Sequence, residues 1–509
     1  MPEPGFDCDV LIAGAGPSGL VLALFLARQG VRVEIVDKVA GPGTTSRALA
    51  VQARTLEFYQ QIGLAETVDA RGRRVPAFNL WVAGRHRARA ILGEIGAGIS
   101  PFPYALVFPQ DEHEQLLIER LREHRIEVHR QTALMDFSED GGGVRARLES
   151  AGGARIATAT FIAGCDGAHS RVRETLGVGF PGGTYEHTFY VADVEGSGPT
   201  VNGEIHVDFD RADFVAVFPL KEDGHVRLVG TVKDEARGHD VAWEDVSRTA
   251  IDHLRMRVSR VNWFSTYRVH HRVANAFRRG RAFLVGDAAH IHSPVGGQGM
   301  NTGIGDAVNL SWKLAAVLGG RADASLLDTY EPERIRFARR LVATTDRGFT
   351  GVTSSSALAR IFRMDIVPAI LPALFRLEWT RRFFFRTVSQ TGIEYRDSRL
   401  SEGRAGRVQG GDRLPWVPAA NPQGDNFAPL TSLDWQVHVY GDAPGGAEAL
   451  CASRGLRLHV FAWSAAAAHA GLARNAVYLI RPDGYVGLAT ERLEQVGTYL
   501  DARRVRAAG

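Results

Sequence analysis

The sequence predicts an α/β fold of more than one domain, and three observations support this prediction. The chain has 509 residues, 45% hydrophobic and 23% charged, which suits a globular protein too long for one ordinary core. Residues 9–37 read as strand, helix and strand. From Tyr185 to about Val273 the pattern changes to alternating strands. We therefore expect an α/β domain with an antiparallel sheet inserted into it.

The first element is a βαβ unit of about thirty residues. An apolar run from Asp9 to Ala13 enters the sequence GAGPSG, good helix formers follow from Leu20 to Gln29, and VRVEIVD is typical of a strand. The second strand ends at Asp37. This order is the one in which a glycine-rich turn joins a strand to a helix.

The glycines of this turn predict a dinucleotide site. Gly14, Gly16 and Gly19 form GxGxxG, whose small residues let the backbone approach a pyrophosphate at the positive end of the helix. Asp37, 18 positions after Gly19, is placed to accept hydrogen bonds from an adenosine ribose. The alternative is a tight packing turn. Because FAD and NAD share this fingerprint, it does not choose between them.

The middle of the chain predicts a helix and then the inserted sheet. Residues Asp111 to Arg125 have the apolar spacing of an amphipathic helix. Within the alternating segment, Trp243 to Val258 is expected to form an interposed helix. The chain then returns at Arg281 to a buried strand, AFLVGD.

The last third is mainly helical before a final α/β segment. A long helix is expected from near Met300, and further helices at about 325–347 and 357–387. A linker rich in Gly, Arg and Pro, roughly 398–426, precedes strands at WQVHVYG, LRLHVFAW and AVYLIRPDGYVGLA.

A second motif favours FAD. Asp287 ends the buried strand, and a loop rich in Pro and Gly, from Pro294 to Gly299, leads into a helix. A carboxylate at Asp287 can hold hydroxyls of a ribityl chain. The helix start can face the pyrimidine end of a flavin, where its partial positive charge favours the anionic reduced ring. The alternative is an ordinary strand and helix.

Charge and cysteine content restrict the other partners. The formal net charge of +3 is spread without a basic block, so no nucleic-acid partner is expected. Cys8, Cys165 and Cys451 lie far apart without CxxC spacing, which fits inert thiols in a reducing compartment. The N-terminus does not resemble a signal peptide. We expect a cytoplasmic protein without a membrane partner, and we interpret the apolar stretch 366–375 as a buried or peripheral helix, membrane association being the remote alternative.

The sequence resembles a known family in three places. GAGPSG, CDGAHSRVR and GDAAHIHSPVGGQGMN, in this order, are similar to the fingerprints of single-component FAD-dependent aromatic hydroxylases, the group A flavoprotein monooxygenases. RPDGYVGLA resembles the thioredoxin-like C-terminal domain of the phenol and polyketide hydroxylase branch. The resemblance implies a Rossmann-like FAD-binding domain at 1–184 and 274–397 with its following helices, a substrate-binding β-sheet domain at 185–273, and a thioredoxin-like domain at 398–509. Without CxxC, the last is expected to be structural or oligomer-forming.

The resemblance also implies which residues hold the cofactor. The glycine turn would bind the pyrophosphate, Asp37 the adenosine ribose, Leu134 the adenine through its backbone, Arg47 and Gln110 the flavin and ribityl-phosphate parts, and Asp287 the ribityl chain. Asp37 is shorter than the glutamate more usual in the family. Asp166 matches a residue associated with both FAD and pyridine nucleotide, the alternative being a cap for the following helix. The expected cofactor-binding residues are Gly14, Gly16, Pro17, Ser18, Gly19, Asp37, Lys38, Arg47, Gln110, Leu134, Asp166, Gly286, Asp287, Pro294, Gly297, Gly299, Met300 and Asn301.

The expected reaction follows from the resemblance. NAD(P)H would reduce the FAD, O2 would add at the flavin C4a position, and the resulting hydroperoxide would hydroxylate the substrate. The substrate is expected to be a phenolic or polycyclic aromatic compound, and a polyketide is one candidate. No second GxGxxG is present for the nicotinamide nucleotide. The catalytic base is not assigned; His, Tyr and Arg residues between Tyr185 and His271 are candidates.

Other functions stay open at this point. The same scaffold can host a Baeyer–Villiger oxygenation, or bind a ligand in a flavin-dependent way without turnover. An NAD dehydrogenase is the weakest option because it leaves Asp287 without a role. No metal site is expected, since His290 and His292 lack a third ligand. A homodimer is left open.

Overall fold

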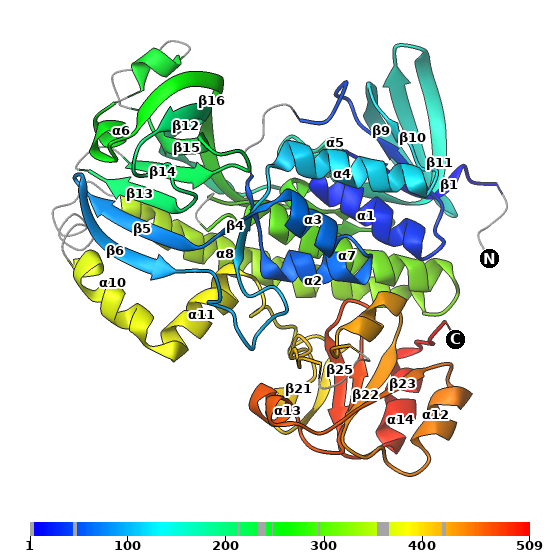
Figure 1. The fold of residues 1–509 in the computed structure, drawn as a ribbon. Helices are drawn as coiled ribbons and strands as arrows, with labels where there is room; N and C mark the ends of the chain where they lie inside the picture. The colour runs from blue at the N-terminus through cyan, green and yellow to red at the C-terminus, as the bar shows by residue number, and fades with distance from the viewer. Residues whose placement is uncertain are drawn as a thin grey trace.

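The structure is a computed structural model that describes residues 5–43, 48–210, 214–232, 241–246, 248–293, 296–353, 366–419 and 424–508. Figure 1 shows an α/β body in the centre and right of the view, a second sheet with β12–β16 at the upper left, and a C-terminal domain below. The mixed α/β fold that the sequence predicts is therefore confirmed.

The body is organised around a parallel sheet in the order β18-β11-β1-β2-β8. A β9–β10 hairpin extends it from β11, and β17 pairs antiparallel with β18. The strands are β1 (Cys8–Ala13), β2 (Val33–Val36), β8 (Val128–His129), β9 (Thr132–Asp140), β10 (Gly143–Ser150), β11 (Gly153–Gly164), β17 (Arg278–Arg279) and β18 (Ala282–Leu284). The three sequence motifs follow β1, β11 and β18. Because these strands are parallel, the motifs meet at the same edge of the sheet.

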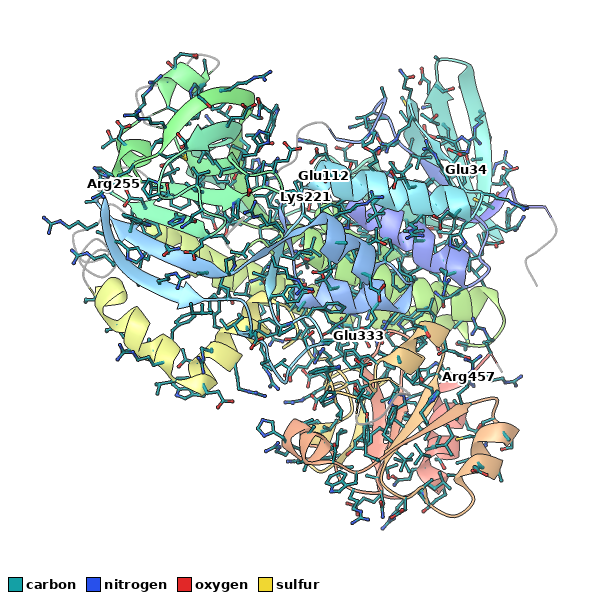
Figure 2. All side chains as sticks on the ribbon, viewed as in Figure 1. Glu34, Glu112, Lys221, Arg255, Glu333 and Arg457 are labelled. Atoms are coloured by element: carbon teal, nitrogen blue, oxygen red, sulfur yellow. The ribbon has the colours of Figure 1, made fainter. Side chains whose placement is uncertain are left out.

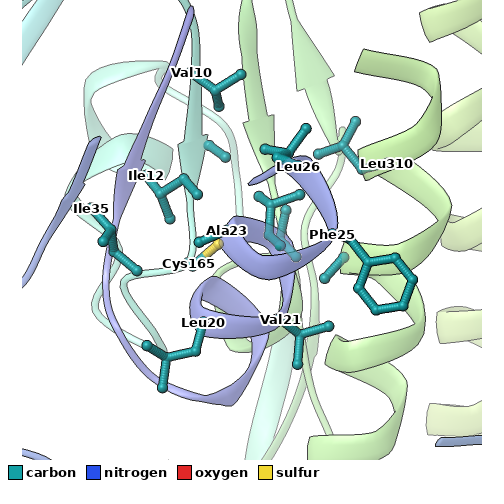
Figure 3. Packing of buried hydrophobic residues seen from close by; sticks show 14 of the residues in the cluster. Val10, Ile12, Leu20, Val21, Ala23, Phe25, Leu26, Ile35, Cys165 and Leu310 are labelled. Carbon is teal, nitrogen blue, oxygen red and sulfur yellow. The ribbon is translucent and has the colours of Figure 1, made fainter. Parts of the chain in front are cut away.

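Helix α1 (Pro17–Arg28) lies between this sheet and helix α7 (Gly299–Leu318). Its residues from Gly19 to Leu26 are all buried, and Figure 3 shows Val10 and Ile12 of β1 on one side of α1 and Leu310 of α7 on the other. A helix that is apolar all round must be covered on every side. The body is completed by α2 (Ala53–Gln61), α3 (Ala65–Arg71), α4 (Gln110–Glu123), α5 (Arg171–Thr175) and a small sheet of β3 (Ala50–Val51), β7 (Ala105–Val107) and β4 (Arg73–Val75).

The second sheet has the order β19-β16-β12-β15-β14-β13-β5-β6. Its pairs are antiparallel except β13 with β5. Its strands are β5 (Ala77–Val82), β6 (Arg85–Ile91), β12 (Gly182–Ser197), β13 (Ile205–Phe209), β14 (Phe214–Pro219), β15 (His225–Thr231), β16 (Arg257–Val273) and β19 (His290–Ile291). The predicted antiparallel sheet is present, and it also takes in β5 and β6, from the part of the chain expected in the first domain.

Two expected helices differ from the structure. The helix expected at 243–258 is reduced to a 3-10 turn at Trp243–Asp245 and to α6 (Thr249–His253), because Val246 is extended and Arg255 has a φ of 53°. Where one helix was expected over 357–387, the described residues form α10 (Val367–Arg376) and α11 (Glu378–Val388) with extended Leu377 between them. The α8 helix (Tyr330–Thr353) follows a 3-10 turn at Ala324–Thr329.

Helices α10 and α11 lie at the lower left edge of the molecule in Figure 1. Ile370 and Leu374 of α10 and Trp379 and Phe383 of α11 are exposed. The stretch 366–375 is therefore peripheral, one of the two arrangements expected. Among the described residues, no helix is both long and apolar enough to cross a lipid bilayer.

The C-terminal domain contains a mixed sheet in the order β21-β20-β25-β24-β22-β23. Its elements are β20 (Glu402–Ala405), β21 (Val408–Gln409), β22 (Gln436–Tyr440), α12 (Ala447–Ser453), β23 (Arg457–Phe461), α13 (Ala465–Ala470), β24 (Val477–Ile480), β25 (Val486–Thr490) and α14 (Glu494–Arg503). Trp312 of α7 contacts Trp435 edge to face, with ring centroids 5.7 Å apart, and both belong to one buried apolar cluster at the domain junction.

Candidate functional site

The glycine turn after β1 has the geometry of a phosphate cradle. Gly14 has a φ of 101°, and a Cβ there would lie 2.2 Å from the Cys165 carbonyl oxygen. A Cβ on Gly19 would meet the Gly14 carbonyl oxygen at 2.0 Å. In contrast, nothing lies within 4 Å of the Cβ position of Gly16, the N-cap of α1. Two glycines thus permit close packing, and the third leaves open space before a helix N-terminus, which fits a pyrophosphate.

Ser18 brings the first and third motifs together. Cβ atoms on Gly286 and Gly303 would lie 2.5 and 2.3 Å from the Ser18 Oγ. The second motif joins them at Gly14, which packs against Cys165. Segments almost 270 residues apart in the sequence are therefore adjacent in the structure.

The Asp37 carboxylate faces the glycine turn. Its Oδ2 accepts a hydrogen bond from the Ala15 amide at 2.6 Å, and its Oδ1 accepts one from the Val39 amide at 2.9 Å. Lys38 is exposed beside it. Arg130, which the sequence reasoning missed, places Nη1 3.5 Å from Asp37 Oδ2. Its buried Nη2 has no hydrogen-bond partner among the described residues, so Arg130 has a donor available to the adenosine end of a dinucleotide.

Leu134 and Gln110 belong to two different elements, β9 and α4. Leu134 is a buried residue of β9, and the amide of Thr132 on the same strand donates to the Asp37 carbonyl oxygen at 2.9 Å. Gln110 begins α4 and donates from Nε2 to Glu114 at 2.8 Å, and its amide donates to the Ala48 carbonyl oxygen at 3.2 Å. Arg47 lies outside the described residues.

Asp166 does cap the following helix, as the alternative interpretation expects. Its Oδ2 accepts the amides of Arg171 and Val172 at 2.7 and 3.1 Å. Its Oδ1 is buried and has no partner among the described residues. Burial raises the pKa of Asp166. One oxygen thus belongs to the helix, and the other remains available to a ligand donor.

A buried ionic cluster of Asp306, His290 and Arg334 supports the backbone of the third motif. Gly286 has a φ of 63°, and its amide donates to Asp306 Oδ2 at 3.1 Å. The same carboxylate contacts His290 Nε2 at 2.7 Å and accepts from Arg334 Nε at 2.5 Å. Burial raises the pKa of Asp306, but Arg334 and His290 outweigh burial and hold this pKa below its ordinary value. The next residue along, Asp287, is exposed at the edge of the sheet.

The loop before α7 is fixed by amide side chains. Asn301 donates to the carbonyl oxygens of Ala50 and Gly297 at 2.8 and 2.9 Å, and its Oδ1 accepts the Gln52 amide at 2.9 Å and the Thr55 hydroxyl at 2.8 Å. Its side chain therefore shapes the loop and has no donor to spare. Gln52 and Gln390 further hold the carbonyl oxygens of Gly296 and Gln298, at 3.0 and 3.2 Å.

The remaining predicted residues lie at this loop, apart from Pro294, which is outside the described residues. Gly297 has a φ of 61°, and a Cβ there would meet the Ala50 Cβ at 2.8 Å. Gly299 and Met300 start α7 and are half-buried. His292 lies beside Gly299, and burial lowers its pKa to about 4. The described residues include no group of three or more His, Cys, Asp or Glu side chains placed to hold a metal ion.

One face of the second sheet approaches this loop. Phe78, Ile205 and Phe218 lie in register on β5, β13 and β14 and pack with Leu49 and Val107 of the small sheet. Leu49 directly precedes Ala50, the neighbour of Gly297. This face is therefore turned toward the loop before α7, whereas α6 packs against the opposite face.

The same row of this face continues into a charged pair. Arg227 of β15 pairs with Asp193 of β12 through Nε and Nη2, at 2.5 and 2.6 Å. Trp263 of β16 lies opposite Asp193, with the Arg227 guanidinium 5.8 Å from its ring. An apolar end and a hydrogen-bonding end on one half-buried surface suit a substrate with an aromatic body and polar substituents. Sequence reasoning placed the candidate base in this region but did not single out this pair.

Comparison with known proteins identifies what the fold resembles. The family model described as "FAD binding domain" matches residues 7–345. The 6-methylpretetramide 4-monooxygenase of Streptomyces rimosus is 35% identical over 465 residues, covering 88% of this chain and 82% of that enzyme. The solved anhydrotetracycline hydroxylase OxyS of Streptomyces rimosus is 28% identical, with a TM-score of 0.77, covering 97% of this chain and 99% of that one.

A further solved structure contains the cofactor. The flavin-dependent monooxygenase PieE, in complex with FAD and substrate, superposes with a TM-score of 0.79 over 98% of this chain and 99% of that one. At 22% identity this likeness concerns the fold alone.

Proposed function

This chain belongs to the FAD-binding-domain family and is a flavin-dependent monooxygenase of aromatic compounds, and from that premise we propose that it uses NAD(P)H and O2 to hydroxylate a phenolic polycyclic substrate of polyketide type. The meeting of Gly16, Ser18 and Gly286 at one sheet edge, together with the half-buried face of the second sheet that carries Arg227 and Asp193, carries the proposal. The activities named for the tetracycline-type relatives support the substrate class.

The residues present fit FAD along its whole length. The open space before Gly16 would take the pyrophosphate, Arg130 and Asp37 the adenosine end, Asp287 the ribityl chain, and the loop at Gly297 the ring. When bound, FAD would accept two electrons from a nicotinamide, and the reduced flavin would activate O2 at its C4a position. The backbone amides at the start of α7 add partial positive charge near the ring.

The half-buried face of the second sheet would orient the substrate. Phe78, Ile205 and Phe218 provide apolar contact for its rings. Arg227 and Asp193 provide a donor and an acceptor for its hydroxyl or carbonyl groups. Because Arg227 is buried and its two hydrogen bonds to Asp193 orient both groups, the pair would fix which ring carbon faces the loop at Gly297. It would also favour the phenolate, since Arg227 stabilises negative charge on a nearby oxygen.

The nicotinamide nucleotide would approach beside Asp166. Burial lowers the pKa of His270, and the nearby charges of Arg272 and Arg268 lower it further. These two arginines therefore lie close to His270 on the second sheet, where they would attract the phosphates of NAD(P)H. The absence of a second GxGxxG supports binding of this kind, without a dedicated nucleotide domain.

The C-terminal residues 398–509 are proposed to be a thioredoxin-like domain without redox function. β22 is parallel to β23 and antiparallel to β24, which is antiparallel to β25. Cys451, the one cysteine of this segment, is buried in α12. The domain boundaries, a homodimer and a cytoplasmic location stay predictions.

The proposal is tested with the purified full-length protein reconstituted with FAD. Phenols, naphthoquinones and anthracycline-type polycycles are scored for stimulated NADPH and NADH oxidation, and products are examined by mass spectrometry. We expect a polycyclic phenol to stimulate oxidation and to gain one oxygen atom as a new hydroxyl. Stoichiometric ligand retention without stimulated NAD(P)H oxidation would instead indicate binding without turnover. A lactone product would indicate a Baeyer–Villiger oxygenation.

A further inference from the structure

The C-terminal domain inserts a charged hairpin between helices of the FAD-binding body. The hairpin between β24 and β25 carries Arg481, Asp483 and Tyr485, all of them buried. Figure 2 shows Glu333 of α8 at the junction of the two units. Arg481 donates to both carboxylate oxygens of Glu333 at 2.9 and 3.0 Å and to those of Asp483 at 3.0 and 2.7 Å.

Glu333 is held by both units at once. Lys313 of α7 donates to its Oε2 at 2.7 Å, and Ser398 donates to its Oε1 at 2.6 Å. Burial raises the pKa of Glu333, but Arg481 and Lys313 outweigh burial and hold this pKa well below its ordinary value. Burial lowers the pKa of Lys313 to about 8. Arg481 is therefore the strongest fixed cation on this carboxylate, and its loss would leave buried charge poorly paired.

The next residue of α8 continues the connection toward the flavin loop. Arg334 donates from Nη1 to the Tyr395 hydroxyl at 2.8 Å, from Nη2 to the Thr302 carbonyl oxygen at 3.0 Å, and from Nε to Asp306. The Tyr395 ring lies 4.3 Å from that of Tyr485 in the C-terminal hairpin. Arg334 thus contacts the C-terminal hairpin through Tyr395 on one side. On the other side it holds α7 through Thr302 and Asp306.

Asp306 completes the path. Its Oδ2 accepts the amide of Gly286, which has a φ of 63° and directly precedes Asp287. Every group between the hairpin and this amide is buried and hydrogen-bonded, so a displacement at one end has few ways to be absorbed.

A second connection runs through α2. Arg413 of the C-terminal domain donates from Nε to Glu57 at 2.8 Å, and Arg54 joins Glu57 to the Asp483 carbonyl oxygen, at 2.8 and 2.7 Å. Thr55 of the same helix donates to Asn301, which holds Gly297. The C-terminal domain therefore reaches the third motif by two paths, one ending at Gly286 and the other at Gly297.

We propose that Arg481 and Tyr395 are positioning residues for the FAD: acting through Glu333, Arg334 and Asp306, the C-terminal domain fixes the backbone at Gly286 and Asp287 in the orientation that binds the ribityl chain. This role rests on the proposed placement of FAD. It gives the C-terminal domain a task in cofactor binding that requires no redox chemistry of its own.

The test compares three full-length variants. Arg481→Met removes the guanidinium at the hairpin, and Tyr395→Phe removes one hydroxyl while keeping the ring. Arg321→Met is the matched control, since Arg321 makes an ion pair with Asp434 across the same domain junction, 3.7 Å long, without contact to Asp306. Measurements are FAD affinity from quenching of flavin fluorescence, the visible circular dichroism of the bound flavin, and the melting temperature of the apoprotein.

We expect Arg481→Met and Tyr395→Phe to weaken FAD binding about tenfold, the factor that corresponds to loss of one hydrogen bond's net contribution. The visible circular dichroism should change in both, because the flavin surroundings shift. Arg321→Met should bind FAD as the wild type does, whatever its melting temperature. Should Arg481→Met fail to fold, Tyr395→Phe decides, because it deletes a single oxygen atom.

Wild-type affinity and spectra in Tyr395→Phe and in folded Arg481→Met would overturn the proposal. So would an equal loss of affinity in Arg321→Met, since domain docking in general would then explain the effect. Asp287→Ala separates the two levels of inference. If Asp287→Ala retains wild-type affinity, the placement of FAD is wrong; if it weakens binding while the positioning variants do not, only the positioning role is wrong.

Discussion

Substitution of two glycines in the same turn is expected to have different effects: one should lower the stability of the fold, and the other should weaken cofactor binding. Gly14 has a left-handed φ and would place a Cβ against the Cys165 carbonyl, whereas Gly16 is extended and faces open space. Gly14→Ala therefore combines a positive φ, about 1–2 kcal/mol, with backbone displacement, about 1–3 kcal/mol, so we expect the apoprotein to lose about 2–5 kcal/mol.

Gly16→Val should act on FAD instead. As an N-cap change it costs the apoprotein only about 0.5–1 kcal/mol. On the proposed placement of FAD, the isopropyl group would fill the space of the pyrophosphate, and loss of two charge-assisted hydrogen bonds to it would cost about 1.5–3 kcal/mol each. FAD affinity should fall by about 100-fold or more.

The assay is urea unfolding of both apoproteins together with FAD titration by fluorescence quenching. The expected pattern is a crossed one: Gly14→Ala loses stability, and Gly16→Val loses affinity at near-normal stability. The reasoning is refuted if Gly16→Val binds FAD within about threefold of wild type, a difference of less than about 0.7 kcal/mol, or if it is destabilised as strongly as Gly14→Ala.

Three further predictions follow from individual side chains. Asp287→Ala should lower FAD retention on gel filtration by about tenfold, the value of one hydrogen bond to a charged group, with an unchanged urea midpoint of the apoprotein; full flavin content would contradict this. Burial lowers the pKa of His113 to about 3 and of His292 to about 4, so below pH 6.5 the unfolded chain takes up protons that the native state does not, and stability should fall with acid. At pH 5 each contributes about 2 kcal/mol of this loss, and urea midpoints should fall less steeply in His113→Gln than in wild type. Arg227→Met should raise the KM for a phenolic substrate by about tenfold or more while FAD affinity stays normal, because the buried guanidinium that would bind an oxygen of the substrate is removed; steady-state kinetics with an unchanged KM would exclude a substrate role.

Local signals predicted the parts of the site that lie close together in sequence. The strand, GxGxxG turn and helix appear as expected, with α1 beginning at Pro17 and Asp37 directly after β2. The start of α7 at Gly299 also agrees with the expected helix near Met300. These elements are local because backbone geometry and apolar spacing within about twenty residues decide them.

Partners distant in the chain could not be predicted this way. Asp306 and Arg334 read as polar positions on two helices, and only the packing of α7 against α8 shows that they support the Gly286 amide. The same holds for Arg130, whose position after a two-residue strand carries no local pattern. The helix expected at 243–258 was wrong beyond Thr249–His253, because pairing of β16 with β12 takes residues from Arg257 onward into the sheet.

Asp166 shows why two interpretations of one residue need not compete. A helix cap uses one carboxylate oxygen, and here Oδ2 accepts the amides of Arg171 and Val172. The cap fixes the carboxyl plane, so Oδ1 is held in a buried position without a partner. Burial raises the pKa of this group, and a ligand donor at Oδ1 would lower it again by stabilising the charged form. The structural role is therefore compatible with the proposed one: the amides at the helix start orient the carboxylate, and on the proposed placement of the cofactors Oδ1 would accept a hydroxyl or amide of FAD or of the nicotinamide nucleotide.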